Sequence, residues 1–432
     1  METQLAPFMQ GTPEGEAAKE ILGRCVHCGF CTATCPTYQL LGDELDGPRG
    51  RIYLMKQMFE GAAVGTETLT HLDRCLTCRS CETTCPSGVE YGRLVDIGRT
   101  VAEQRIERPL GQRLQRSVLR EGLTSPWFGP AMALGRAVRG ALPTALRDKI
   151  PQGRPAGDLP QRTHERHLIL PTGCVQPSML PGIDAATLRV MDQLGFGRAD
   201  VQTDSARCCG AIRQHLSDPT GALAQVRQNV DAWYPLLASG QAEGVLVNAS
   251  GCAVMVRDYA HLLAGDPAYA ARAVLVSEKA MDPIEWLEPM LPQIQQQLAQ
   301  LNRDQLSSDE ARLVYHAPCT QQHGLRLKGS VERFLMALGA QLQPVSDSHL
   351  CCGSAGTYSV LQPALSHQLR DRKLSALEAS EPICILSANV GCITHLAAAS
   401  GRPVLHWLEW LDDRLAGRLS SSQARGEATQ HP

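Results

Sequence analysis

The chain reads Cys25-Val-His-Cys28-Gly-Phe-Cys31-Thr-Ala-Thr-Cys35-Pro36 and, 50 residues further on, Cys75-Leu-Thr-Cys78-Arg-Ser-Cys81-Glu-Thr-Thr-Cys85-Pro86. Both stretches have the spacing C-x2-C-x2-C-x3-C-P. This spacing is typical of cysteines that hold a cubane iron–sulfur cluster. The duplication therefore predicts two [4Fe-4S] clusters near the start of the chain.

The fourth cysteine of each stretch is expected to serve the other cluster. Three thiolates on one tight loop can bind three corners of a cube, whereas the fourth belongs to the next helix and points away. We expect cluster I to be held by Cys25, Cys28, Cys31 and Cys85, and cluster II by Cys75, Cys78, Cys81 and Cys35. The alternative is zinc or disulfides, but zinc sites usually pair two C-x2-C units across a longer spacer.

The composition indicates a reducing compartment, because the 17 cysteines of this 432-residue chain include eight in motifs that need free thiolates. A formal net charge of −3 gives no indication of a nucleic-acid partner. The N-terminus lacks a basic and an apolar signal region, and no apolar run is long enough for a membrane span. We expect a cytoplasmic protein, or one peripheral at the inner face of the cytoplasmic membrane.

A second duplication follows a proline-rich linker. Each copy has an apolar run ending at a cysteine, a Cys-Cys-Gly triplet, and a further apolar run ending at a cysteine. The cysteines are Cys174, Cys208, Cys209 and Cys252 in the first copy, and Cys319, Cys351, Cys352 and Cys392 in the second. Short apolar runs that alternate with helical segments predict parallel sheets. The cysteines follow strand ends or begin helices, where α/β sheets place ligand sites.

These patterns predict a fold that is α+β and α/β: an N-terminal helical two-cluster ferredoxin-like domain, then two duplicated α/β domains with parallel sheets. We call the duplicated domains CCG domains, after the triplet. The expected divisions are 1–100 for the two-cluster domain, 101–165 for a helical segment and proline-rich linker, 166–300 and 301–416 for the two CCG domains, and 417–432 for a disordered tail.

The CCG cysteines admit three interpretations. They hold a further iron–sulfur centre, or they hold zinc, or they are unmetallated thiols of a redox relay. Gly210 and Gly353 are expected to allow the irregular turn that adjacent cysteines need. Cys384 lies inside an apolar run and is expected to be a buried small side chain. The histidines nearby are expected to be ordinary core or solvent residues: His316, His323 and His349.

Two arginine-containing segments leave alternatives open. Arg49 and Arg51 follow a Gly-Pro turn, and they either begin a solvated helix or offset the negative charge of a cluster. Residues 126–139 form either a docking face or, as the amphipathic pattern favours, a helix packed on its own domain.

The chain resembles the iron–sulfur subunits of flavin-linked 2-hydroxyacid and glycerol-3-phosphate dehydrogenases, and heterodisulfide reductase subunits share the CCG domain. The runs CVHCGFCTATCPTYQLLGDELDGPRGRIYL, CLTCRSCETTCPSG and SHLCCGSAGTY look like the glycolate oxidase (glycolate dehydrogenase) iron–sulfur subunit family. The likeness covers nearly the whole chain, and the eight ferredoxin-type cysteines match the family ligands position by position.

The resemblance implies two flavin-type partner subunits, which alone would carry FAD. One would oxidise glycolate to glyoxylate, and electrons would leave through this chain to a membrane quinone or electron carrier. The chain has no G-x-G-x-x-G behind a strand and no acid–base motif, so we expect an electron carrier without catalytic residues of its own. Alternatives are a thiol/disulfide reductase with catalytic CCG sites, a zinc-bound scaffold, or an equivalent subunit for lactate or glycerol-3-phosphate.

The CCG domains depart from the wider family pattern at one position. That pattern ends in C-x-x-C and gives five cysteines per domain, whereas this chain has Ala249 and Asn389 in place of the first cysteine of the pair. A five-thiolate non-cubane cluster like that of heterodisulfide reductase is therefore not expected in either domain, and four thiolates remain in each.

Overall fold

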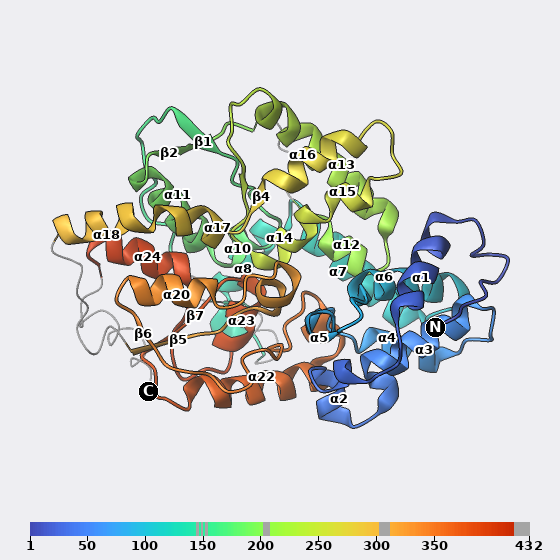
Figure 1. Ribbon diagram of the computed structural model, residues 1–432. Coiled ribbons are helices and arrows are strands. Elements are labelled where there is room, and N and C mark those ends of the chain that lie inside the picture. The colour runs from blue at the N-terminus through green and yellow to red at the C-terminus, as the bar shows by residue number, and fades with distance from the viewer. Residues whose placement is uncertain (144–146, 148–149, 152–153, 202–207, 302–311, 419–432) are drawn as a thin grey trace.

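The computed structural model describes residues 1–143, 147, 150–151, 154–201, 208–301 and 312–418. A helical N-terminal region lies on one side of the molecule, and the two duplicated regions make up the rest (Figure 1). The fold class expected from the sequence is confirmed. The expected disordered tail lies outside the described residues from residue 419 onward.

Short helices surround the two cysteine stretches. They are α1 (Pro13–Arg24), η1 (Phe30–Thr32), α2 (Pro36–Leu41), η2 (Glu44–Asp46), α3 (Pro48–Phe59), α4 (Thr66–Asp73), α5 (Ser80–Thr84) and α6 (Tyr91–Arg105). Their inward faces form one core, in which Leu22, Met55 and Leu94 are fully buried. Proline begins α1, α2 and α3, where its missing N–H costs no helical hydrogen bond.

Both cysteine loops need left-handed backbone at matching positions. His27 and Thr77 have φ angles of 56° and 53°, and Gly29 and Arg79 have φ angles of 85° and 58°. Left-handed backbone at residues other than glycine is costly and is concentrated at functional sites. The two loops therefore keep one shape although their sequences differ. The placement of the fourth cysteine at the start of a helix is right for Cys35, which caps α2, and wrong for Cys85, which ends α5.

The next segment contains α7 (Leu110–Thr124), α8 (Phe128–Ala137) and the short η3 (Arg139–Ala141), and none of their residues is fully buried. Arg136 of α8 donates a hydrogen bond of 2.6 Å to the backbone oxygen of Met179. Trp127, just before α8, is 77% exposed. The contact of Arg136 is with the first CCG region, and the choice between a docking face and a helix packed on its own domain stays a prediction for residues 126–139.

The two duplicated regions contain parallel strands in the same order. The first has β1 (Arg166–Leu168), β2 (Phe196–Arg198), β3 (Val245–Leu246) and β4 (Ala280–Met281); the second has β5 (Arg312–Tyr315), β6 (Gln341–Leu342), β7 (Cys384–Ser387) and β8 (Val404–His406). In the second, the order is β6-β5-β7-β8. In the first, β1 pairs with β2 and β3 with β4, and a bridge from Ile169 to Val245 joins the pairs. The parallel sheets expected from the sequence are present.

Helices cover the strands of both regions. They are α10 (Gln176–Met179), α11 (Pro181–Gln193), α12 (Ala211–His215), α13 (Pro219–Ala238), α14 (Ser250–Arg257), α15 (Tyr259–Leu262), α16 (Ala270–Lys279), α17 (Pro283–Leu287), η4 (Glu288–Met290), α18 (Leu291–Gln300), the π-helical turn η5 (Thr320–Gly324), α20 (Ser330–Ala337), α21 (Tyr358–Leu361), α22 (Pro363–Glu378), α23 (Val390–Ala397) and α24 (Trp407–Ala416). Among the described residues, no helix has the length and apolar character needed to cross a bilayer.

The two regions share one hydrophobic core. Trp407 of α24 and Phe196 of β2 belong to the same buried group. Arg189 of α11 donates a hydrogen bond of 2.8 Å to Asp412 of α24, so the last helix is fastened to the first region. Burial of apolar surface from both regions stabilises them together.

Candidate metal centres

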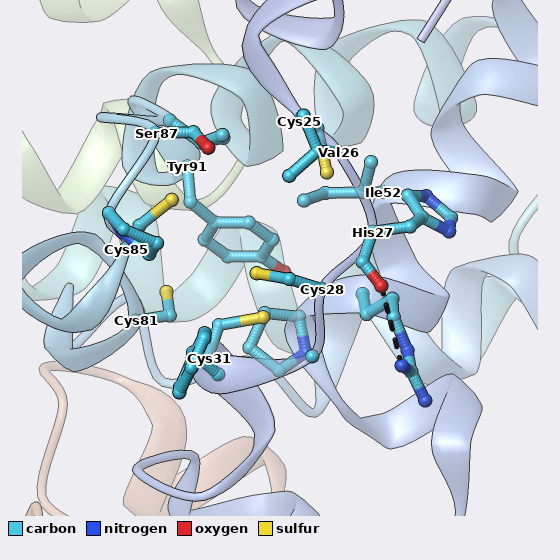
Figure 2. Close-up of a pocket in the computed structure, with 16 residues that line it drawn as sticks. Cys25, Val26, His27, Cys28, Cys31, Ile52, Cys81, Cys85, Ser87 and Tyr91 are labelled. Atoms are coloured by element: carbon cyan, nitrogen blue, oxygen red, sulfur yellow. Dashed lines mark hydrogen bonds between the residues drawn. The ribbon is translucent and has the colours of Figure 1, made fainter.

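One pocket of the N-terminal region gathers the cysteines predicted to hold cluster I: Cys25, Cys28, Cys31 and Cys85. Figure 2 shows their side chains around the same hollow, together with Tyr91. Cys28 is exposed, and the neighbouring Val26 and Phe30 are 69% and 63% exposed. This pocket therefore opens to the molecular surface beside two apolar side chains.

A second pocket gathers the cysteines predicted to hold cluster II: Cys35, Cys75, Cys78 and Cys81. Cys81 and Tyr91 line both pockets, so the two sites are neighbours. Arg51 also lines the second pocket and is only 1% exposed. Its Nη1 lies 4.0 Å from the Cys35 sulfur, and its Nη2 donates to Thr37 over 3.1 Å. Of the two alternatives for Arg51, the solvated helix start is wrong, and a positive charge beside the sulfurs is what the structure has.

Two features of these residues fit two iron–sulfur clusters: the thiol ligands, and one buried hydroxyl that has no hydrogen-bond partner among the described residues. All eight ferredoxin-type cysteines are free thiols. The hydroxyl of Tyr91 is buried and has no hydrogen-bond partner among the described residues. Sulfur atoms of a bound cluster would accept from such a hydroxyl, and hydrogen bonds of this kind tune cluster potentials.

Burial keeps three of the thiols, Cys31, Cys78 and Cys81, protonated when no metal is bound. It raises the pKa of Cys31 to about 11, and the neighbouring Cys25 and Cys85 add to the shift. Burial also raises the pKa of Cys78 and of Cys81 well above the ordinary value. Metal binding must therefore displace these protons, which couples occupancy of the site to pH.

The first CCG region holds its four cysteines in a row: Cys174, Cys208, Cys209 and Cys252. Hydrogen bonds from Cys174 and Cys209 lower the pKa of Cys208 to about 4, so this row contains one stabilised thiolate. Asn229 and Tyr259 fix the backbone of the pair, since each donates a hydrogen bond of 2.9 Å to the carbonyl oxygen of Cys208 and Cys209, respectively.

The second CCG region repeats this row with Cys319, Cys351, Cys352 and Cys392. The sulfurs of Cys319 and Cys351 are 3.8 Å apart. Gly210 and Gly353 follow the cysteine pairs with φ angles of 96° and 86°, which confirms the irregular turn expected from glycine. Cys384 is buried, as expected.

The three histidines of this region differ in their surroundings. His316 is 2% exposed, and its Nδ1 lies 2.9 Å from the Ser387 hydroxyl. Burial lowers the pKa of His316 to about 3, with a contribution from Lys373, so the ring is neutral at pH 7. His323 links two parts of the molecule: Nδ1 lies 2.8 Å from Thr83 Oγ1, and Nε2 lies 3.0 Å from the His349 oxygen. His316 and His323 are thus buried, one in the core and one at an interface.

The second CCG site adjoins the cluster II pocket. Leu76, Cys351, Tyr358 and Leu369 form a buried group, and Cys78 and Cys319 pack against it. Cys78 comes from the second ferredoxin-type stretch, whereas Cys319 and Cys351 come from the second CCG region. The helix α5 follows Cys78 in the chain and α22 carries Leu369, and Figure 1 shows both helices at the junction of the N-terminal region with the rest.

Comparison with known proteins matches three parts of the chain to known families. Residues 21–89 match a family described as 4Fe-4S dicluster domain, and residues 170–257 and 313–397 match one described as cysteine-rich domain. The glycolate oxidase iron-sulfur subunit of Escherichia coli (strain K12) is 48% identical over 96% of this chain and 99% of that protein. This chain belongs to the glycolate oxidase iron–sulfur subunit family. The probable glycolate oxidase iron-sulfur subunit of Bacillus subtilis (strain 168) is 28% identical over 90% of both chains.

A more distant relative is similar in sequence to only part of this chain. Lactate utilization protein A of Geobacillus kaustophilus is 27% identical over 54% of this chain and 92% of that protein. The similarity to the glycolate oxidase subunits thus extends over more of the chain than the similarity to the lactate protein.

Three residues beside the pockets of this family member were not predicted as site residues from the sequence, or had two alternative roles there. Tyr91 lies between the pockets, Arg51 lies beside Cys35, and Arg99 donates to the Cys75 oxygen over 2.6 Å. Spacing could reveal the cysteines because their ligation is local, but these three side chains come from other helices. An aromatic residue six positions after the last cysteine is no recognisable signal by itself.

Proposed function

We propose that this chain is the electron-transfer iron–sulfur subunit of a flavin-dependent glycolate oxidase (glycolate dehydrogenase) complex. The observation that carries this proposal is the pair of adjoining pockets, each lined by four free cysteines that the spacing had grouped. The first pocket would hold one [4Fe-4S] cluster through Cys25, Cys28, Cys31 and Cys85. The second would hold another through Cys75, Cys78, Cys81 and Cys35.

The clusters, when bound, supply one-electron transfer, and the chain positions them and excludes water. Arg51 offsets negative charge at the second pocket, and the Tyr91 hydroxyl, which lies where the two pockets meet, donates its single proton to one of the two clusters. The CCG cysteines form a further metal or redox site. Substrate oxidation takes place elsewhere, because cofactor chemistry of this kind needs a flavin and this chain has no sequence motif for one.

The complex contains two flavin-type partner subunits, and FAD is confined to them. It oxidises glycolate to glyoxylate and passes electrons through this chain to a quinone-type acceptor of the membrane. Glycolate is favoured over lactate, because a relative named for glycolate oxidase is similar over 96% of this chain. We place the chain in the cytoplasm, where it associates peripherally with the membrane, and we divide it as the sequence indicates, at residues 100, 165, 300 and 416.

The test is anaerobic co-purification with the flavin subunits, followed by iron analysis and electron paramagnetic resonance. We expect about eight irons from the two pockets. Glycolate should reduce the clusters only when the flavin subunits are present. Glycolate oxidation by the isolated chain with a dye acceptor would contradict the proposal, and so would an iron content near four with stoichiometric zinc in its place.

A further inference from the structure

The second CCG site contains a tight group of three potential ligands, and the described residues of the first CCG region contain no such group. One ligand atom each of His316, Cys352 and Cys392 lies within 4.8 Å of the other two, and all three residues are buried. The ferredoxin-type cysteines do not form so close a group of three anywhere in the described ranges. A cubane spreads its ligand sulfurs, because each binds a separate iron, whereas ligands of a single ion converge on one point.

Neighbouring polar groups orient two of these ligands. The Nδ1 of His316 lies 2.9 Å from the Ser387 hydroxyl, which leaves Nε2 as the nitrogen for a metal. The Nδ2 of Asn389 donates to the Cys392 sulfur over 3.4 Å. Hydrogen bonds of this kind fix the tautomer of a ligating histidine and the charge of a ligating thiolate.

The two CCG regions differ at these supporting positions. The residues of the first region that correspond to His316, Ser387 and Asn389 are Pro171, Val247 and Ala249. The histidine, its hydroxyl partner and the amide that contacts the sulfur are thus present together in one copy and absent together from the other. His316 and Ser387 are buried, so solvent exposure does not account for polar side chains at these two positions.

The charge and the spacing of the site favour zinc. Lys373 interacts electrostatically with Cys352 and Cys351 and is 3% exposed, so one excess thiolate charge can be balanced inside the protein. Sulfurs that share a tetrahedral zinc ion at about 2.3 Å lie about 3.8 Å apart, which is compatible with the 4.8 Å that bounds the distances between the ligand atoms of this group. Cys351 hydrogen-bonds to Cys352 and is therefore the nearest further thiol for a fourth position.

We propose that the second CCG region binds one zinc ion through His316, Cys352 and Cys392, with Cys351 within reach of the fourth position. Neutral imidazole and thiolate are the donors that zinc prefers, and it binds four ligands in structural sites. The inference is independent of the proposed electron-transfer function, because zinc bound here is counted separately from the iron of the two clusters.

The test uses the full chain, purified anaerobically with its clusters, and measures zinc by elemental analysis and its ligands by X-ray absorption at the zinc edge. We expect zinc at this site, with nitrogen and sulfur neighbours, either as purified or after titration with zinc chloride. His316→Ala should lower the zinc content by one per chain. His316→Cys should restore zinc with sulfur in place of nitrogen. Ser387→Ala should weaken zinc binding about 10–100-fold in competition with a chelator.

Matched substitutions outside the ligand group serve as controls. Pro171→Ala changes the corresponding position of the first CCG region, and Cys384→Ala removes a buried thiol that is not a ligand; both should leave the zinc content unchanged. Three outcomes would overturn the proposal: no zinc after titration, an unchanged zinc content and nitrogen-to-sulfur ratio in His316→Ala, or additional iron and sulfide in the second CCG region. If His316→Ala does not fold, the competition experiment with Ser387→Ala takes its place, and zinc binding as tight as that of the wild type would overturn the proposal.

Discussion

Tyr91 stands between the two cluster pockets with its hydroxyl buried and unpartnered within the described part of the chain. We expect Tyr91→Phe to lower the reduction potential of the cluster whose sulfur accepts from this hydroxyl, because a hydrogen bond to cluster sulfur stabilises the reduced, more negative state. One hydrogen bond of about 0.5–1.5 kcal/mol corresponds to roughly 20–60 mV. Redox titration followed by electron paramagnetic resonance measures the shift. Tyr53→Phe, at an exposed position, is the control and should leave both potentials unchanged.

Crossed ligation can be tested one cysteine at a time. If Cys35 serves the second pocket and Cys85 the first, Cys35→Ser should alter the spectrum of the cluster held by Cys75, Cys78 and Cys81. Cys85→Ser should alter the other cluster instead. Paramagnetic resonance of the two variants shows which signal changes, and damage by Cys35→Ser to the Cys25 cluster alone would refute the crossing.

At the residue scale, the sequence could group the eight ferredoxin-type cysteines because their spacing is set by the loops that carry them. It could not evaluate His316, whose neighbours Cys352 and Cys392 lie far along the chain and meet it only after the strands pair. It left Arg51 undecided for the same reason, since burial is a property of the packed helices. The cysteine motifs depend on residues that are close in sequence, whereas the environments of His316 and Arg51 depend on contacts between residues far apart in sequence.

Two helices begin with the same capping arrangement, and one of the caps is a buried acid. Asp282 caps α17 and His406 caps α24, each together with a glutamate three residues on. Burial raises the pKa of Asp282 to about 7. The folded chain therefore binds this proton more tightly than the unfolded chain, so the contribution of Asp282 to stability is greatest at low pH and declines as pH rises through about 7.

We expect Asp282→Asn to flatten this pH dependence, because asparagine still caps the helix but carries no charge. Relative to the wild type, the variant should gain on the order of 2–3 kcal/mol in stability between pH 5 and pH 8. Thermal or denaturant unfolding at the two pH values measures the change. Glu288→Gln, an exposed neighbour, is the control, and an Asp282→Asn variant with the slope of the wild type would contradict the argument.

At the element scale, the sequence identified the repeated strands and helices because apolar periodicity and the Cys-Cys-Gly triplets recur in both copies. It did not show that α24 of the second copy packs against α11 of the first. Periodicity states that a helix has an apolar face but not which partner covers it. The shared core is therefore knowledge that only the structure provides.

At the scale of the whole molecule, the N-terminal region is attached to both CCG regions. Arg79 forms an ion pair of 2.9 Å with Asp258 of the first, and Thr83 contacts His323 of the second. Because burial raises the pKa of Cys31, Cys78 and Cys81, these thiols hold their protons when no metal is bound, and we expect iron removal to loosen this region. Hydrogen exchange should then increase in residues 25–95, while the first sheet near residues 245–281 keeps its protection. Equal exchange with and without iron would contradict this coupling.

The unequal exposure of the two pockets has a consequence for handling the protein in air. Cys28 reaches the surface beside Val26 and Phe30, whereas Leu76 and Cys78 of the second pocket pack against Cys351 and Tyr358 of the second CCG region. Dioxygen can therefore approach the first cluster without any movement of the chain. Brief aeration should bleach that cluster first and release its iron. The second cluster should decay more slowly, because its loss follows the opening of the junction between the N-terminal region and the second CCG region.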